Sequence, residues 1–392
     1  MYQCIYCDAE ILKRSSEHII HAALGSSLQS DKIICKDCNN YFSRKESGDI
    51  DKKFVEQFEV FRNLLNVKND RGKLPPTIKR LKLGNEEIIL EPGGKIAYQK
   101  SRREIIKDEE GKVKFHISSP NLEKGKEQLR HIKKQYGEKA ELIIEQAKLK
   151  RSYANTPIEF DFSLGGEENT KAVAKMLYNF VHYLDRESLI SLPELDWSDI
   201  KQYLRYNATK SNIETGYDFI NPIPIEIPKD DLSNYIFISG SSQQGIIFGH
   251  VVIFGSISFS SIIHNRYEGV DFGYGIKQPL NVKQSEAFYE FEIQPFNSNI
   301  FRDKLAYSEI QINKMGKEIN KLLRIYQDKA TKEAQNKLIS EAMNKVFKGY
   351  EGEYFSSEIL QNLSNVIADE YTKFLFRIDT ETPIDLEDST DK

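Results

Sequence analysis

Several features are missing from this 392-residue chain, and each absence removes a class of protein. No apolar run approaches the roughly 18 residues that a membrane-spanning helix needs. The first residues form neither the basic nor the apolar segment that directs secretion. Hydrophobic residues make up 39% and charged residues 29%, so the bias of disordered or collagen-like chains is absent too. We therefore expect a soluble, cytoplasmic protein of two or three folded units with no membrane contact.

Cysteine is also scarce, because the chain has only four, and they form two Cys-x-x-Cys pairs. Cys4 and Cys7 make the first pair, and Cys35 and Cys38 the second. In a reducing compartment, paired thiols bind metal more often than they form disulfides. Four thiolates fill the tetrahedral shell of one Zn²⁺ and leave no position open for substrate. We expect a structural zinc site, with a redox dithiol or unrelated free thiols as the alternatives.

The segment between the two cysteine pairs carries groups suited to cutting a phosphodiester. That reaction needs a base to activate water and a hard divalent cation to neutralise the developing charge. Glu17 offers a carboxylate oxygen suited to Mg²⁺, and His18 offers an imidazole that titrates near neutral pH. Asn39 directly follows the last cysteine, and its amide oxygen is a neutral hard ligand that could meet Glu17 across the cation. These three residues are the candidate catalytic centre.

The order of these motifs resembles a known family. Cys-x-x-Cys, Glu-His-Ile-Ile, Ala-Leu-Gly and then Ile-Cys-x-x-Cys-Asn-Asn-x-Phe is similar to the HNH endonuclease superfamily, in particular its HNH-5 branch and the zinc-bearing phage endonuclease VII type. The resemblance covers about residues 4–54. It implies a ββα-metal fold in which Glu17 and Asn39 hold one Mg²⁺ or Mn²⁺ while His18 is the general base.

The sequence departs from this family pattern at several positions. Many relatives have proline in place of His21 and a second glycine in place of Ser26. The middle asparagine that orients the base has no clear counterpart, and Gln29 or Asp31 could substitute for it. We interpret His21 as a solvent-facing helical histidine rather than an extra ligand or phosphate contact. Asn40 is expected to cap the helix that begins near Tyr41.

For the whole chain we predict an α+β fold in four consecutive segments. Residues 1–57 form the zinc-stabilised ββα-metal (HNH) module, and residues 58–150 a basic β-meander with a helical linker. Residues 151–378 form a larger α+β companion domain. Residues 379–392 contain six acids and one lysine without apolar periodicity, and we expect them to be a disordered tail.

Hydrophobic periodicity predicts the elements inside these segments. Alternation and turn signals predict a meander over 78–117, a strand over 158–162 and four strands within 223–293. The helical spacing is found in five stretches, with Ser356 as the N-cap of the last. These stretches are residues 54–65, 121–150 (one helix, or two broken at Gly137), 173–184, 303–347 and 356–376.

The net charge of −4 hides an uneven distribution along the chain. Residues 61–150 contain 22 basic and 13 acidic side chains, a net +9, whereas residues 151–392 contain 25 and 36, a net −11. A basic stretch beside a nuclease could hold phosphates. A solvated Lys/Glu face explains the same count equally well.

Other conspicuous residues have structural explanations. His182 lies in an apolar helical pattern, so we expect a hydrogen-bonded structural histidine. Gly165-Gly166 and the run 240–245 lack the Gly-Lys-Ser/Thr ending of a phosphate loop, so we expect turns. Three aromatic residues, Phe272, Tyr274 and Tyr289, are expected to pack in a β core rather than to stack on bases.

Our first functional hypothesis is a Mg²⁺-dependent DNA endonuclease, acting as a homodimer because one site cuts one strand. The architecture suits restriction or phage defence, with residues 58–392 choosing the substrate or responding to a small-molecule or protein activator. The C-terminal two-thirds is diffusely similar to the companion region of stand-alone HNH-5 proteins, through its Pro-Pro, Pro-Gly-Gly and Lys171–Phe180 stretches, and this resemblance assigns no site residues.

Two other functions remain open from the sequence. A zinc knuckle could bind nucleic acid without cutting it, with the C-terminal region making protein contacts. Glu17 and His18 would then be ordinary surface residues. RNA cleavage by the same three residues is the second alternative, because metal-assisted hydrolysis does not by itself distinguish the sugars.

Overall fold

A computed structural model describes residues 2–44, 49–84, 86–107, 113–136, 148–151, 158, 164–206, 213–218, 225–281, 289–296, 309–348 and 356–383. Helices and strands are mixed along the chain, which confirms the predicted α+β class. Residues 1–76 and 161–325 form one compact unit, and residues 77–160 and 326–392 form the other. Each unit thus combines two separate stretches of chain.

The N-terminal module has the strand, strand, helix order that the resemblance implied. Strands β1 and β2 are two residues each and pair antiparallel, with Glu17 opposite Ser30 and His18 opposite Gln29. Helix α1 follows, and Cys35 is its N-cap, with Sγ accepting from the backbone N–H of Cys38 at 3.5 Å. The elements in chain order are β1 (Glu17–His18), the 3-10 helix η1 (Ala22–Leu24), β2 (Gln29–Ser30), α1 (Lys36–Phe42), α2 (Ile50–Gln57) and α3 (Glu59–Leu64).

A six-stranded antiparallel sheet forms the centre of the same unit. Its order is β14-β13-β10-β11-β12-β9, so β10 and β11, the most buried strands, lie in the middle. The four strands predicted within 223–293 are present, whereas β9 and β13 were missed. The strands are β9 (Glu214–Tyr217), β10 (Asn234–Ser241), β11 (Ile246–Ile253), β12 (Ile257–His264), β13 (Phe272–Gln278) and β14 (Tyr289–Glu292).

Glycines explain why β13 was hard to recognise. They interrupt its apolar pattern at Gly273 and Gly275, which the sequence alone presents as turn signals. In the sheet, a Cβ on Gly275 would lie 2.6 Å from ring carbons of both Phe237 and Phe291. The missing side chain therefore makes room for aromatic rings from the neighbouring strands.

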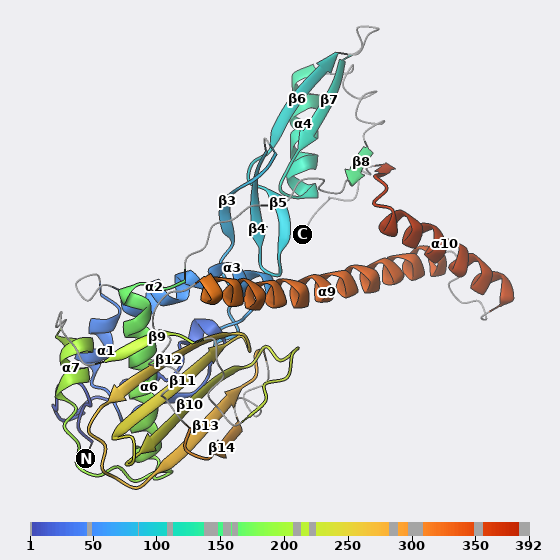
Figure 1. The fold of residues 1–392 in the computed structure, drawn as a ribbon. Helices are drawn as coiled ribbons and strands as arrows, with labels where there is room; N and C mark the ends of the chain where they lie inside the picture. Colours follow the sequence, from blue (N-terminus) through green and yellow to red (C-terminus); the bar gives the residue numbers. More distant parts are fainter. Residues whose placement is uncertain are drawn as a thin grey trace. The chain divides into compact units, whose positions relative to one another are not determined.

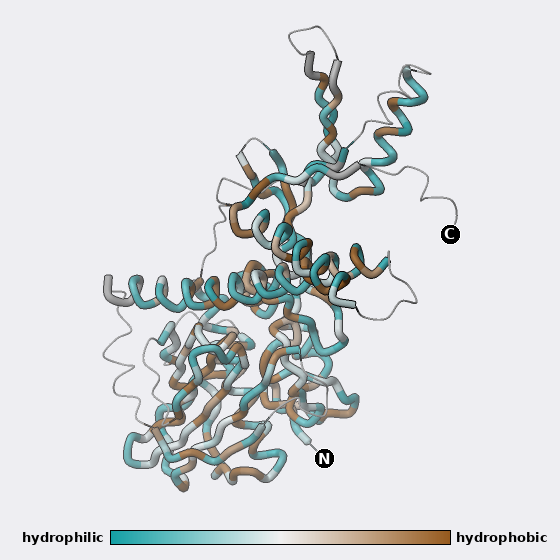
Figure 2. The backbone as a smooth tube through the Cα atoms, turned by 90° about the vertical axis from the view of Figure 1, so that its right-hand side faces the viewer, coloured by the Kyte–Doolittle hydropathy of each residue, from teal (hydrophilic) through white to brown (hydrophobic). Residues whose placement is uncertain are grey.

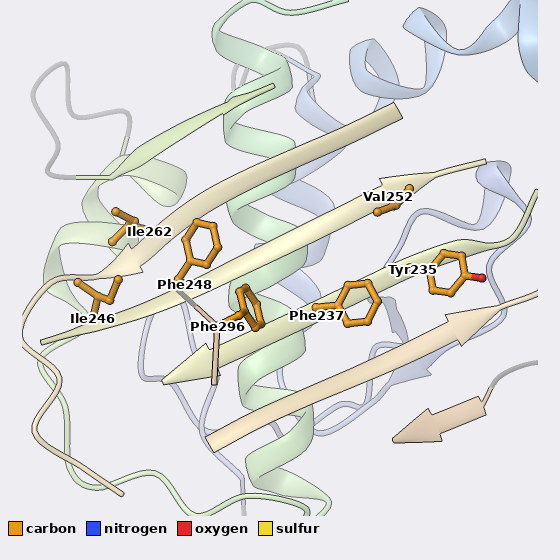
Figure 3. Close-up of a cluster of buried hydrophobic side chains, with 7 residues drawn as sticks. All are labelled: Tyr235, Phe237, Ile246, Phe248, Val252, Ile262 and Phe296. Atoms are coloured by element: carbon orange, nitrogen blue, oxygen red, sulfur yellow. The ribbon is translucent and has the colours of Figure 1, made fainter. Parts of the chain in front are cut away.

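Helix α6 (Glu167–Arg186) runs along one face of this sheet, and it confirms the helix predicted over 173–184 (Figure 1). Its approach is close, because a Cβ on Gly249 of β11 would lie 2.4 Å from Leu177 Cδ2. The opposite face carries a separate cluster of buried side chains (Figure 3). The cluster contains Tyr235, Phe237, Ile246, Phe248, Val252, Ile262 and Phe296.

The other side of α6 packs against the N-terminal module. Tyr178 donates a hydrogen bond to the backbone oxygen of Ile5 at 2.7 Å, and Tyr6 donates to Asn179 Oδ1 at 2.6 Å. Because α6 lies between the module and the sheet, its central turns are buried on every side. The short helix α7 (Ser198–Arg205) packs nearby against α6 and β12. This layering joins residues 1–76 to residues 161–325 in one unit.

The second unit contains the basic segment. The predicted meander over 78–117 is in fact a three-stranded sheet and a separate two-stranded hairpin. Its strands are β3 (Ile78–Leu83), β4 (Glu86–Glu91) and β5 (Lys95–Tyr98) in the sheet, and β6 (Arg102–Lys107) and β7 (Val113–Ser118) in the hairpin. Helix α4 (Leu122–Tyr136) covers the first half of the helix predicted over 121–150, and residues 137–147 lie outside the described part.

Two corrections concern the ends of this unit. Lys148–Arg151 forms strand β8 rather than the end of a helix, and it pairs with strand β15 (Thr380–Pro383). Part of the segment expected to be a disordered tail is therefore a strand, while residues 384–392 lie outside the described part. The predicted strand over 158–162 lies almost wholly outside it too.

Two long helices complete the chain. The division between the units falls within α9 (Glu309–Phe347), which is mostly hydrophilic along its length (Figure 2). Helix α10 (Ser357–Leu375) confirms the predicted cap, because Ser356 Oγ accepts from the backbone N–H of Ile359 at 3.2 Å. Among the described helices, none is both long and apolar enough to cross a bilayer.

Candidate functional site

The four cysteine sulfurs converge at one point of the N-terminal module. All four lie within 4.8 Å of one another, with Cys4 and Cys38 buried and Cys7 and Cys35 partly exposed. The Sγ atoms of Cys7 and Cys35 are 3.8 Å apart, too far for a disulfide. Zinc–sulfur bonds of about 2.3 Å in a tetrahedron place neighbouring sulfurs about 3.8 Å apart. The cluster therefore fits one structural Zn²⁺.

Short backbone hydrogen bonds build this arrangement. The first pair lies on a tight turn, in which the N–H of Asp8 donates to the oxygen of Cys4 at 2.9 Å. The N–H of Ile5 donates to the oxygen of Ile33 at 2.9 Å, which ties this turn to the chain just before the second pair. Since the second pair begins a helix, both pairs have a fixed backbone and their thiols point to a common centre.

Beside the cysteines lies a small cavity lined by the three predicted catalytic residues. Its volume is about 120 Å³, room for roughly four water molecules. Strand β1, helices α1 and α2, and helix α6 all contribute to its wall. The lining residues are Ser16, Glu17, His18, His21, Asn39, Ser43, Asp51, Phe54, Ala172, Lys175 and Met176.

Glu17 is the most buried acid of the cavity, with 6% of its surface exposed. Its Oε1 accepts hydrogen bonds from Lys175 Nζ and, at 3.2 Å, from Asn179 Nδ2. Burial raises the pKa of Glu17 above its ordinary value, and the Lys175 ammonium opposes that rise. The carboxylate is thus held in place by two groups from α6.

His18 lies partly exposed at the cavity wall, and its Nε2 is 3.3 Å from Asp70 Oδ2. Burial lowers the pKa of His18 below its ordinary value, against the opposing effect of Asp70. The two residues expected to replace the missing asparagine are engaged elsewhere. Gln29 accepts from Ser16 Oγ at 2.7 Å, and Asp31 accepts from Arg14 at 3.0 Å. Asp70 is therefore the acid that lies beside the imidazole.

Asn39 is held by its amide nitrogen. Its Nδ2 donates to Ser15 Oγ at 3.1 Å and to the backbone oxygen of Ser16 at 3.0 Å. The Oδ1 atom takes no part in these two bonds, so they fix the side chain without using the atom that could coordinate a cation. The neighbouring Asn40 lies inside α1, which begins at Lys36, so the prediction that it caps the helix is wrong.

His21 also differs from expectation. It is not a solvent-facing helical residue, because it precedes η1 and lines the cavity. Its Nδ1 accepts from the backbone N–H of Ala23 at 3.1 Å, and burial lowers its pKa to about 4. His21 is therefore neutral at pH 7 and its imidazole caps the turn after His18.

Three polar residues at or beside the cavity were not predicted from the sequence. Lys175 and Asn179 come from α6, in the region whose diffuse resemblance assigned no site residues, and both contact Glu17. Asp51, on α2, accepts from Lys175 at 2.8 and 3.0 Å. A usable signal did exist, because Lys171, Lys175 and Asn179 recur every four residues on an otherwise apolar helix, and buried lysine needs a partner.

The remaining sequence expectations concern residues away from this cavity. His182 is buried, as expected, but it packs against the rings of Tyr178 and Trp197, and its Nε2 has no hydrogen-bond partner among the described residues. Gly165-Gly166 precedes α6, and residues 242–245 form a turn between β10 and β11. Tyr274 is buried as predicted, whereas Tyr289 is 54% exposed and so is not a core residue.

Comparison with known proteins agrees with this geometry. A family model described as HNH endonuclease matches residues 4–59, the segment that contains the four cysteines and the predicted catalytic residues. The match confirms the resemblance inferred from residues 4–54, and the module it identifies implies binding to nucleic acid. No curated protein and no solved structure matches the chain.

Proposed function

We propose that this protein is an HNH endonuclease that hydrolyses DNA phosphodiester bonds with Mg²⁺ or Mn²⁺. The observation that carries the proposal is the convergence of Glu17, His18 and Asn39 on one cavity beside the cysteine cluster. Zinc held by the four cysteines would tie together the two ends of this short module. The catalytic groups then have a fixed backbone, as positioning for catalysis requires.

The cavity suits a hard cation at Glu17. Its wall carries two acidic side chains, Glu17 and Asp51, and the amide of Asn39. Glu17 and Asn39 would hold the divalent cation through oxygen atoms. When bound, such an ion neutralises negative charge on the phosphate and on the leaving oxygen.

His18 is suited to take a proton from water. Burial lowers the pKa of His18, so the imidazole is neutral at pH 7 and has a nitrogen free to accept a proton. The Asp70 carboxylate beside Nε2 favours the tautomer with its proton on that nitrogen, which leaves Nδ1 to accept a proton. Asp70 then positions His18, which is the role of the middle asparagine in the family.

The binding-only alternative predicts that Glu17 is an ordinary surface residue. Glu17 is instead 6% exposed and accepts hydrogen bonds from two residues of α6. Burying a carboxylate is costly even when it is paired with a cation, and a catalytic role gives a reason to keep one. The contribution of α6 also supports a companion region that controls activation or substrate choice, as in a restriction or defence nuclease.

Plasmid nicking tests the proposal. The zinc-loaded protein should convert supercoiled plasmid to open-circular and linear forms with Mg²⁺ or Mn²⁺ and leave it intact without either. Replacing His18 by Ala should slow cleavage by about 10²-fold or more, the usual contribution of a general base. His131→Ala is the matched control, because this exposed histidine lies on α4. Full cleavage by the His18→Ala variant would refute the assignment.

A further inference from the structure

Lys175 occupies an unusual position for a lysine. Its side chain is only 5% exposed, and its ammonium lies inside the cavity wall rather than at the surface. Nζ donates to Glu17 Oε1 and to both carboxylate oxygens of Asp51, at 2.8 and 3.0 Å. The ring of Phe42 lies on another side, with its centroid 4.8 Å from Nζ. Three carboxylate oxygens and an aromatic face thus surround one cationic atom.

The same surroundings would suit a hard divalent cation. Carboxylate oxygens are its preferred ligands, at about 2.0 to 2.6 Å. The Asp51 oxygens lie at 2.8 and 3.0 Å from Nζ, so they could reach an ion at that point by moving less than about 1 Å. Two cations cannot share this point, because they would repel each other and compete for the same oxygens.

Charge favours an exchange of the two cations. Two carboxylates can carry two negative charges, of which one ammonium balances only one, whereas a divalent ion in place of the ammonium would balance both. Without either cation, Glu17 and Asp51 would face each other as buried like charges, an arrangement that costs several kcal/mol. The lysine therefore has a clear physical role in the protein before metal binds.

Resting on the proposed function, we propose that the Lys175 ammonium and the catalytic divalent cation compete for one site, in which Asp51 is a ligand in addition to Glu17 and Asn39. Lys175 keeps the carboxylates paired while no metal is bound. Metal binding then displaces its ammonium from Glu17 and Asp51. Since Lys175 belongs to α6, the companion region sets how tightly the nuclease module binds its metal.

Asn179 keeps Glu17 in place during this exchange. Its Nδ2 donates to Glu17 Oε1 at 3.2 Å, and its Oδ1 accepts from Tyr6 at 2.6 Å. Because Tyr6 lies in the turn of the first cysteine pair, Glu17 stays connected to the zinc module when Lys175 leaves. The ammonium can then move without loss of the carboxylate position.

Mn²⁺ binding to the full zinc-loaded chain tests this competition without reference to cleavage. The measurement is a Mn²⁺ titration followed by electron paramagnetic resonance at pH 8. Lys175→Met should bind Mn²⁺ about tenfold or more tightly than the wild type, because the competing charge is gone. Asp51→Asn should bind it about tenfold or more weakly. Lys171→Met is the matched control, because Lys171 is a buried lysine one turn earlier on α6 that pairs with Glu167.

A second readout comes from thermal unfolding of the same samples. Lys175→Met should unfold at a lower temperature than the wild type without Mn²⁺ and should gain more stability from Mn²⁺. Lys171→Met should respond to Mn²⁺ like the wild type. If Lys175→Met does not fold, the Asp51→Asn variant provides the test. Wild-type Mn²⁺ affinity in Asp51→Asn would show that Asp51 is not a ligand and would overturn the proposal.

The outcomes separate this inference from the proposed function. Unchanged or weaker Mn²⁺ binding by Lys175→Met would overturn the competition, even if the wild type cleaves plasmid in a His18-dependent way. Tighter binding by Lys175→Met and weaker binding by Asp51→Asn would support it, even if no plasmid is cut. In that last case the cation exchange stands and the endonuclease assignment fails.

Discussion

Asp70 offers the sharpest test of how the cavity works, because sequence comparison gave it no role. Its carboxylate lies 3.3 Å from His18 Nε2, and the two side chains are 22% and 25% exposed. Once His18 has accepted a proton, two unit charges at that distance interact by about 1 kcal/mol at the dielectric constant of water and by about 5 kcal/mol at a value near 20. Partial exposure places the pair between these limits, so Asp70 stabilises the imidazolium that forms when His18 takes a proton from water.

Replacing Asp70 by Asn should lower kcat/KM for plasmid cleavage by about tenfold to a hundredfold, equivalent to about 1 to 3 kcal/mol. The pH profile should change as well. Asp70 opposes the effect of burial, so its loss lowers the pKa of His18 further, and the acid limb of the profile should move to lower pH. Metal-dependent cleavage measured from pH 5 to pH 9 gives both quantities.

The matched control for this experiment is Asp31→Asn. Asp31 lies in the same module and forms an ion pair with Arg14, whose side chain is 83% exposed. Removing it should leave the rate and the profile nearly unchanged, since exposed pairs contribute little. Equal effects of the two substitutions, or a slower Asp70→Asn enzyme with an unshifted acid limb, would refute the positioning role.

Two further predictions concern stability. Gly249→Ala should destabilise the protein by about 1 to 3 kcal/mol, because the added Cβ would lie 2.4 Å from Leu177 Cδ2, and denaturant unfolding checks this. Gly316→Ala on α9, with open space at its Cβ, should be neutral or stabilising, so equal losses would contradict the packing argument. Burial lowers the pKa of His182 to about 3, against 6.5 in the unfolded chain. Below pH 6.5 only the unfolded state takes up this proton, so the free energy of unfolding falls as the pH falls. Between pH 7 and pH 5 the wild type should lose about 2 kcal/mol more of this free energy than His182→Gln. Equal pH dependence of the two proteins would disprove the prediction.

The N-terminal module was predictable because its chemistry is local in sequence. Two Cys-x-x-Cys pairs specify a metal cluster by spacing alone, and Asn39 is placed by the adjacent Cys38. The core of the companion region was also predictable in part. Helix α6 has a long apolar pattern of helical period, and the central strands β10 and β11 have apolar runs typical of buried strands.

What the sequence could not give were contacts between distant stretches of chain. Asp51 and Lys175 lie 124 positions apart, and no periodicity links an acid on one helix to a lysine on another. Asp70 follows α3 in an irregular segment, so nothing in its neighbourhood marks it as a partner of His18. Lys148–Arg151 became a strand only because Thr380–Pro383 pairs with it, which is a tertiary influence that local patterns do not contain.

We propose that zinc stabilises the module whereas Glu17 takes part in the chemistry. Zinc content and Mg²⁺-dependent plasmid cleavage, measured on the same samples of wild type and Glu17→Gln, test this division most directly. We predict one zinc per chain in both proteins and cleavage only by the wild type. A Glu17→Gln protein that keeps its zinc and cuts plasmid at the wild-type rate would refute the catalytic role of Glu17.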